Sequence, residues 1–118
     1  MVKLERISLH NEGLKKFFSP NEARILTLLW ESENLTSGQI QKQCDDLSLA
    51  CVAGTLDRLV KSGFVYRTID TSDSRVRYIY APACTQTELG TKISEQVVDC
   101  LVETFGAAVV SSIGQLRR

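Results

Sequence analysis

Five cations within residues 58–77 are the side chains of this sequence best suited to a chemical role. They are Arg58, Lys61, Arg67, Arg75 and Arg77, and only two aspartates accompany them. Guanidinium groups bind phosphate oxygens through paired hydrogen bonds, so this stretch favours a phosphate-rich partner. Catalytic chemistry has no comparable candidates, because His10 is the single histidine and no nucleophile–base pair or metal cluster can be built by spacing. We therefore expect no enzyme activity, no metal and no cofactor.

The cysteines at positions 44, 51, 84 and 100 show no C-x-x-C pair or other metal-type spacing. We interpret them as free thiols that behave as small apolar residues of a cytoplasmic protein. A redox-sensing or metal-sensing role is the alternative, and Cys51 is its best candidate because it lies on the helix that follows Ser48.

The chain carries no net charge, which argues against indiscriminate binding to nucleic acid. The distribution is uneven, however: residues 58–77 and 1–18 are both positive, whereas residues 19–57 and 78–118 are negative. No apolar run is long enough for a membrane span, and residues 1–18 lack the apolar centre of a secretory signal. Positive charge concentrated in two places is a weak electrostatic footprint for DNA.

A helix and a hairpin are predicted to position the cations. Ser48 can cap a helix over about 48–62, and Gly63 suits a left-handed C-terminal cap. The apolar stripe of that helix consists of Val52, Leu56, Leu59 and Val60. The segments FVYRTI and VRYIYA are rich in β-branched and aromatic residues, and the polar DTSDS separates them. The pattern predicts a wing over 64–80.

Two further helices are predicted before Ser48. Ser19, Pro20 and Glu22 form a capping box with proline at the first helical position, followed by core residues Ile25, Leu28 and Leu29 and an anchoring Trp30. Thr36 and Gln39 repeat the capping box. The second helix should run about ten residues to about Asp46, with Ile40 and Cys44 facing inward. Two helices joined by a short turn into a polar cap indicate a helix-turn-helix.

The two ends of the chain carry further apolar patterns. Residues 3–18 look helical toward their end, at Leu14, Phe17 and Phe18, and this helix either packs on its own core or is exchanged across a dimer. After Pro82, a second stripe follows helical spacing: Leu89, Ile93, Val97, Val98, Leu101, Val102 and Phe105. We interpret it as a dimerisation helix, with folding back on the same subunit as the alternative.

These patterns predict a mainly α fold with a small antiparallel β-hairpin, an α+β winged helix-turn-helix with a C-terminal dimerisation helix. The expected organisation is an N-terminal arm or helix at 1–18, a winged helix-turn-helix DNA-binding domain at 19–82 and a helical dimerisation region at 83–118.

Several motifs resemble known families. The run LDRLVKSG at Leu56–Gly63, the YIYAP close of the wing at Tyr78–Pro82 and the pair Phe105-Gly106 resemble the penicillinase-repressor family (BlaI/MecI type). The segment DTSDSR at Asp70–Arg75, followed by TELG at Thr87–Gly90, is similar to the multiple-antibiotic-resistance regulators (MarR type). Both resemblances imply a homodimeric, DNA-binding transcriptional regulator, and a repressor in particular. A small-molecule or protein effector is possible, but no residue identifies it.

The resemblance places the helix over 48–62 in the major groove and the wing on the backbone or minor groove of double-stranded DNA. The implied DNA-binding residues are Thr36, Ser37, Ser48, Leu49, Ala50, Cys51, Ala53, Gly54, Asp57, Arg67, Ser74, Arg75 and Arg77. The exposed helix face lacks a basic residue among Leu49, Ala50, Ala53, Gly54 and Asp57, and we expect Asp57 to repel phosphates. Small side chains still permit deep entry into the groove. The alternative is a winged-helix protein–protein adaptor that reads no bases.

Overall fold

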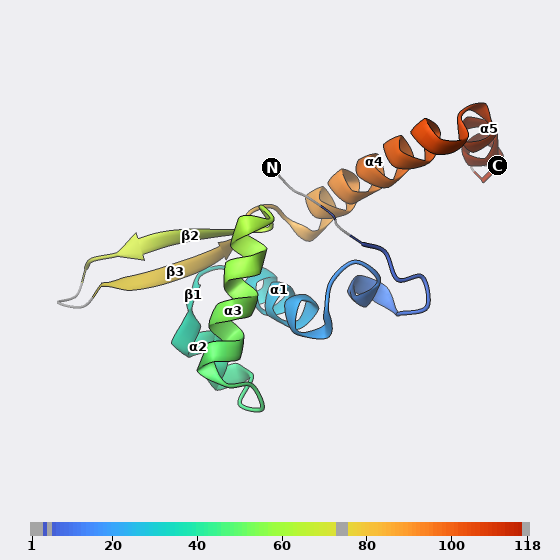
Figure 1. Cartoon of the computed structure of the whole chain (residues 1–118). Coiled ribbons are helices and arrows are strands. Elements are labelled where there is room, and N and C mark those ends of the chain that lie inside the picture. The colour runs from blue at the N-terminus through green and yellow to red at the C-terminus, as the bar shows by residue number, and fades with distance from the viewer. Residues whose placement is uncertain (1–3, 5, 73–75, 117–118) are drawn as a thin grey trace. The chain divides into compact units, whose positions relative to one another are not determined.

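The computed structural model describes residues 4, 6–72 and 76–116 (Figure 1). The chain divides into two compact units, Met1–Thr85 and Gln86–Arg118. The first unit contains three α-helices, a short 3-10 helix and a three-stranded sheet, and the second contains two helices. Among the described helices, none combines the length and the apolar character that crossing a membrane requires.

Helix α1 (Pro20–Ser32) begins where the sequence predicts. The Ser19 hydroxyl accepts a hydrogen bond from the Glu22 amide, and the Glu22 carboxylate accepts one from the Ser19 amide. Ile25, Leu26 and Leu29 are buried, whereas the predicted core residue Leu28 is only half-buried. The helix is therefore rotated slightly from the predicted face, toward Leu26.

Helix α2 (Ser37–Gln43) is shorter than predicted, because the chain leaves the helix at Cys44 rather than near Asp46. Its capping box at Thr36 and Gln39 is present, and Ile40 and Cys44 are buried as expected. The preceding residues Leu35–Thr36 form strand β1, which the sequence analysis did not predict.

Helix α3 (Leu49–Lys61) ends in a Schellman motif. The Phe64 amide donates to the Leu59 carbonyl, and the Gly63 amide donates to the Val60 carbonyl. Gly63 has a φ of 83°, which favours glycine as the sequence predicted. The motif redirects the chain from α3 straight into strand β2, so it sets where the wing begins.

Strands β2 (Val65–Asp70) and β3 (Arg77–Pro82) form the predicted antiparallel hairpin, and β1 pairs with the other edge of β3 to give the order β1-β3-β2. The base of the hairpin joins the core through Val65 and Tyr80, while its far end extends away from the helices (Figure 1). The core of the first unit consists of Phe18, Ala23, Ile25, Leu26, Leu29, Leu35, Ile40, Cys44, Val52, Thr55, Leu56, Leu59, Phe64, Val65 and Tyr80.

The N-terminal segment differs from the predicted helix. Within the described residues of this segment, only Gly13–Lys16 is helical, as the 3-10 helix η1. The Ser8 amide donates to the Lys16 carbonyl at 2.6 Å and closes a loop around it. Gly13 has a φ of 55°, which interrupts α-helical geometry. Phe18 packs edge-on against Phe64, with ring centroids 4.8 Å apart, so the end of this segment packs on its own unit.

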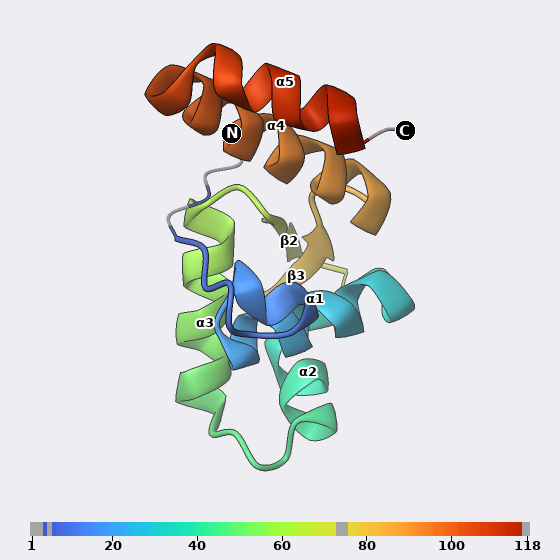
Figure 2. The same ribbon diagram turned by 90° about the vertical axis from the view of Figure 1, so that its right-hand side faces the viewer.

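The second unit consists of α4 (Gln86–Phe105) and α5 (Ala107–Leu116). Gly106, with a φ of 63°, separates the two helices, and α5 runs in a new direction from α4 (Figure 2). In the predicted dimerisation stripe, Leu89 and Ile93 are already buried, whereas Leu101, Val102 and Phe105 are exposed. The unpartnered part of the stripe therefore lies in the second half of α4.

Candidate nucleic-acid interface

The exposed face of α3 consists of small and apolar side chains. Ser48, Leu49, Ala50 and Ala53 are exposed, and Cys51, Gly54 and Asp57 are half-buried. A Cβ atom at Gly54 would lie 3.9 Å from the nearest side-chain atom, on Arg58, so internal packing does not require glycine there. The structure thus brings the predicted residues of α3 together on one smooth, open helix face.

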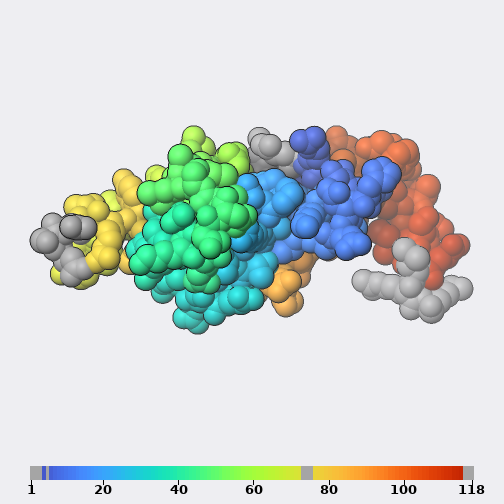
Figure 3. Space-filling model, turned by 90° about the horizontal axis from the view of Figure 1, so that it is seen from below, coloured from blue at the N-terminus to red at the C-terminus, as the bar shows by residue number. Residues whose placement is uncertain are grey.

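Helices α2 and α3 and the wing share one face of the first unit (Figure 3). The hydroxyl of Thr36 accepts from the Gln39 amide, and the Ser48 hydroxyl accepts from the Cys51 amide. Both hydroxyls therefore fix the start of a helix. The amide groups at the two helix starts are the donors that a phosphate oxygen would meet on this face.

The predicted cations of the wing lie in different surroundings. Arg77 is exposed at the start of β3, opposite Asp70. Arg67 on β2 lies beside Asp57 of α3, with 3.8 Å between Nη1 and Oδ1, and its guanidinium carbon is 4.9 Å from the centre of the Tyr78 ring. The predicted residues Ser74 and Arg75 lie outside the described part of the chain.

Asp57 has two cationic neighbours, which changes its expected effect on DNA. Its carboxylate lies 3.0 Å from the Lys61 ammonium, one helical turn away, in addition to the contact with Arg67. The expectation of simple repulsion treated Asp57 as an isolated charge. The paired carboxylate presents much less negative potential to a phosphate than an isolated one would.

The sequence analysis missed the contacts that hold the turn between α2 and α3. Arg24 of α1 binds Asp46 of the turn through two contacts, at 2.8 and 2.9 Å. Gln41 donates to the Leu47 carbonyl at 3.2 Å. Asn21 donates to the Cys51 sulfur at 3.6 Å, which ties the start of α1 to the first turn of α3. Two of these three contacts join residues more than 20 positions apart, so no local sequence pattern predicts them.

The ion pair shifts the titration of both partners. The hydrogen bond from Arg24 holds the pKa of the Asp46 carboxyl below its ordinary value of 3.8, and the same bond raises the pKa of Arg24. Since the folded pKa of Asp46 is lowered, the stabilisation is complete above pH 3.8 and disappears as the pH falls through the folded value.

Replacing Asp46 with asparagine should therefore lower stability at neutral pH and have no effect at strongly acidic pH. Urea unfolding at a series of pH values measures the difference in the free energy of unfolding between the wild type and Asp46→Asn. Asp45→Asn removes a charge from the same turn without breaking the Arg24–Asp46 contact, so it is the control and should lower stability at neutral pH by less. A difference for Asp46→Asn that stays constant as the pH falls would contradict the assignment.

All four cysteines lie in the described part of the chain, and none of them forms a disulfide. Cys44 is buried, Cys51 and Cys84 are half-buried, and Cys100 is exposed. The carbonyl of Cys84 accepts a hydrogen bond from the Trp30 indole, which supports Trp30 as an anchor of the core. Redox sensing by Cys51 stays a prediction.

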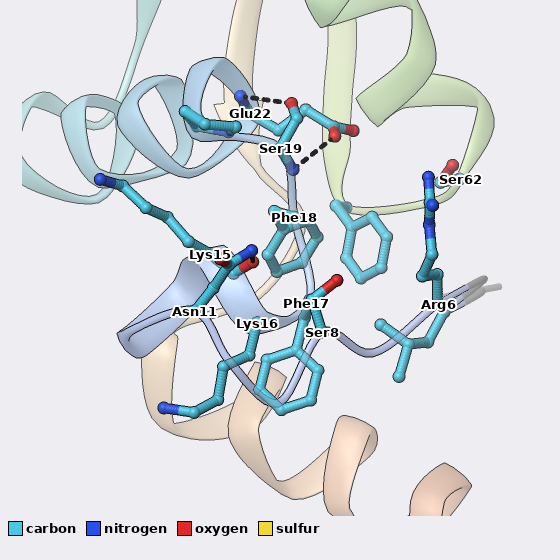
Figure 4. Close-up of a pocket in the computed structure, with 13 residues that line it drawn as sticks. Arg6, Ser8, Asn11, Lys15, Lys16, Phe17, Phe18, Ser19, Glu22 and Ser62 are labelled. Atoms are coloured by element: carbon cyan, nitrogen blue, oxygen red, sulfur yellow. Dashed lines mark hydrogen bonds between the residues drawn. The ribbon is translucent and has the colours of Figure 1, made fainter.

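A cavity of about 340 Å³ lies beneath the N-terminal loop of the first unit (Figure 4). Phe17, Phe18 and Phe64 supply aromatic walls, and Arg6, Lys15 and Lys16 also border it. The charged ends of these three cations point in different directions and lie apart from one another (Figure 4). The cavity therefore lacks the convergent charge that would indicate a site for an anion.

Comparison with solved structures identifies the architecture. The similar chains include a probable transcriptional regulator from Pseudomonas aeruginosa, with 20% identity, a TM-score of 0.53, and coverage of 84% of this chain and 75% of that one. They also include Rv0081 from M. tuberculosis, with 22% identity, a TM-score of 0.51, and coverage of 75% and 83%. A third is the adhesin competence repressor AdcR from Streptococcus pyogenes, with 22% identity, a TM-score of 0.50, and coverage of 84% and 76%. At this identity the likeness establishes the fold alone, and it confirms the predicted fold class.

Comparison of the sequence identifies the family. Residues 18–76, half of the chain, match the family model described as the MarR family. No curated protein matches the chain. The matched segment runs from Phe18, just before α1, to Val76, just before β3, so it contains the helix-turn-helix. The resemblance to penicillinase repressors stays a prediction. The chain therefore belongs to the MarR family of DNA-binding winged-helix transcription regulators, and it is not an enzyme.

Proposed function

We propose that the chain is a sequence-specific transcriptional repressor that binds double-stranded DNA as a homodimer. In this proposal α3 enters the major groove, and the wing contacts the backbone or the minor groove. The observation that carries the proposal is the position of α2, α3 and the wing on one face of the first unit, with the small side chains of Ala50, Ala53 and Gly54 on the outer side of α3. Such a surface permits close approach to base edges and thymine methyl groups.

The exposed half of the α4 stripe supports the dimer. Leu101, Val102 and Phe105 lie on this half, and Phe105 is 64% exposed. Apolar side chains at helical spacing gain most by packing against an equivalent face, and a second copy of the chain supplies one. A dimer also fits a two-fold symmetric operator, because each α3 reads one half-site.

A selection experiment tests the proposal. Purified protein is used to enrich duplexes from a randomised library, and the affinity for the selected duplex and for random duplex is then measured over a range of salt concentration. We expect a selected, pseudo-palindromic sequence and a steep fall of affinity with salt. No binding at any salt concentration would favour the alternative function, a winged-helix protein–protein adaptor that docks through the apolar face of α3.

The wing cations give a sharper prediction. Replacing Arg75 and Arg77 together with alanine should weaken binding to all duplexes and flatten the salt dependence by about two units of slope, because each phosphate contact contributes about 0.9 units. Salt titrations of the double variant and the wild type measure the difference. Lys92→Ala on α4 is the control and should leave the slope unchanged. An unchanged slope in the double variant would mean that these wing cations do not contact the DNA phosphates.

A further inference from the structure

A bridge between α3 and the wing is formed by Asp57, Arg67 and Tyr78. Asp57 lies on α3, Arg67 on β2 and Tyr78 on β3, with 3.8 Å between the charged atoms of the first two and 4.9 Å from the guanidinium carbon to the ring centre. Lys61 adds a second cation at 3.0 Å from Asp57. We call the three residues Asp57, Arg67 and Tyr78 the helix–wing bridge.

The strand register explains why these side chains meet. Side chains two residues apart on a strand point to the same face, so Arg67 shares a face with the buried Val65. Arg67 pairs with Tyr80, and Tyr78 is the next residue of β3 on that same face. A guanidinium placed diagonally across two strands from an aromatic ring can stack on it. The bridge therefore continues the core-facing side of the hairpin past the point where apolar packing ends.

Beyond the bridge, the wing has little apolar packing to fix its direction. Ile69 is 60% exposed and Val76 is 72% exposed. A hairpin held only at its base can tilt relative to the helix that it accompanies, and tilting would move its far end relative to the groove. The bridge connects α3 to the wing outside the core, where it restricts such tilting.

We propose that Asp57 is a positioning residue that raises sequence discrimination at the expense of general DNA affinity. The proposal rests on the proposed DNA-binding function. The Asp57 carboxylate holds Arg67, and through it the wing, at a fixed angle to α3. It also offsets the charge of Arg67 and Lys61, and this lowers the attraction to any phosphate backbone, whatever its sequence.

The decisive variant is Asp57→Asn, which keeps the shape of the side chain and removes its charge. Binding to random duplex should tighten by about threefold, and the salt dependence should steepen by about one unit, because a cation becomes available to phosphate. The ratio of affinities for selected and random duplex should fall by about tenfold, because the wing is no longer held at a fixed angle to α3. Asp57→Glu keeps the charge and should recover most of the ratio.

Two controls separate positioning from general electrostatics and from folding. Asp45→Asn removes the same charge from the turn before α3, so it should tighten binding to both duplexes alike and leave the ratio unchanged. Arg67→Met breaks the bridge from the other side. It should lower the ratio as well, but it should weaken binding to random duplex rather than tighten it.

Hydrogen exchange of the β2 and β3 amides, measured without DNA, tests the positioning directly. Asp57→Asn and Arg67→Met should both exchange faster in the wing while α1 exchanges as in the wild type. If the wild type binds no duplex, the proposed function fails, and the exchange data still decide whether Asp57 holds the wing. If Asp57→Asn changes neither the wing exchange nor the affinity ratio, or if Asp45→Asn lowers the ratio equally, the proposal is overturned.

Discussion

Replacing Val97 and Leu101 with glutamate should convert the protein from dimers to monomers. Both residues lie on the apolar stripe of α4; Val97 is half-buried, and Leu101 is exposed within a single chain. Burying a side chain of this size contributes roughly 1.5–3 kcal/mol, and a glutamate in its place would bring an uncompensated charge into the interface from each subunit. Together, the two changes should cost more binding free energy than a dimer interface of ordinary size can lose without separating.

Sedimentation at micromolar concentration measures the outcome. Lys92→Glu is a matched control, since it changes the charge by the same amount but lies on α4 five residues before Val97, on the far side of the helix. It should leave the dimer intact. A wild type that sediments as a monomer would contradict the predicted dimer, whatever the variants do.

The parts of the fold that the sequence predicts well are those fixed by short-range chemistry. A serine or threonine followed three residues later by Glu or Gln marks both the start of α1 and the start of α2, because the reciprocal hydrogen bonds form within one turn. Gly63 marks the end of α3 for the same reason, since the left-handed conformation is costly for most other residues. These signals depend on neighbouring residues, so they survive in any tertiary context.

The parts that the sequence predicts poorly depend on distant partners. Strand β1 has two residues and exists only because β3 pairs with it, so its composition carries no strand signal. Thr55 is fully buried although its residue type suggests exposure. Its hydroxyl donates to the Cys51 carbonyl, and this satisfies the polar group inside the core. The spacing of Leu14, Phe17 and Phe18 suggests a helix, but Gly13 and the closed loop from Ser8 to Lys16 give a 3-10 turn instead.

The candidate interface shows the same division. The family resemblance places Ala50 and Ala53 on the exposed face of α3, and both are exposed in the structure. The charge of Asp57 could not be interpreted from its own helix alone, because one of its two cationic partners, Arg67, comes from the wing. Residue type and spacing thus identify which surface is available, whereas its electrostatics depend on side chains from several elements.

Replacing Ala50 with glutamate should abolish binding to the selected duplex without harming the fold. Ala50 is the second residue of α3 and is exposed, so the larger side chain displaces nothing from the core. A carboxylate in the first turn of a helix is stabilising by about 0.3–1 kcal/mol through the helix dipole. In the proposed complex, however, the same carboxylate faces the groove and its phosphates. Like charges brought together at an interface cost several kcal/mol, so we expect affinity to fall by about a hundredfold or more.

The matched control is Ala108→Glu, which makes the same change at the second residue of α5, also exposed. Thermal unfolding should show both variants at least as stable as the wild type, and DNA titration should separate them, with binding lost only in Ala50→Glu. This pattern would assign the loss to the face of α3, because helix position, substitution and charge are identical in the two variants. Equal affinity for DNA in Ala50→Glu and the wild type would instead mean that α3 does not enter the groove, and its small apolar face would then be free to bind a protein.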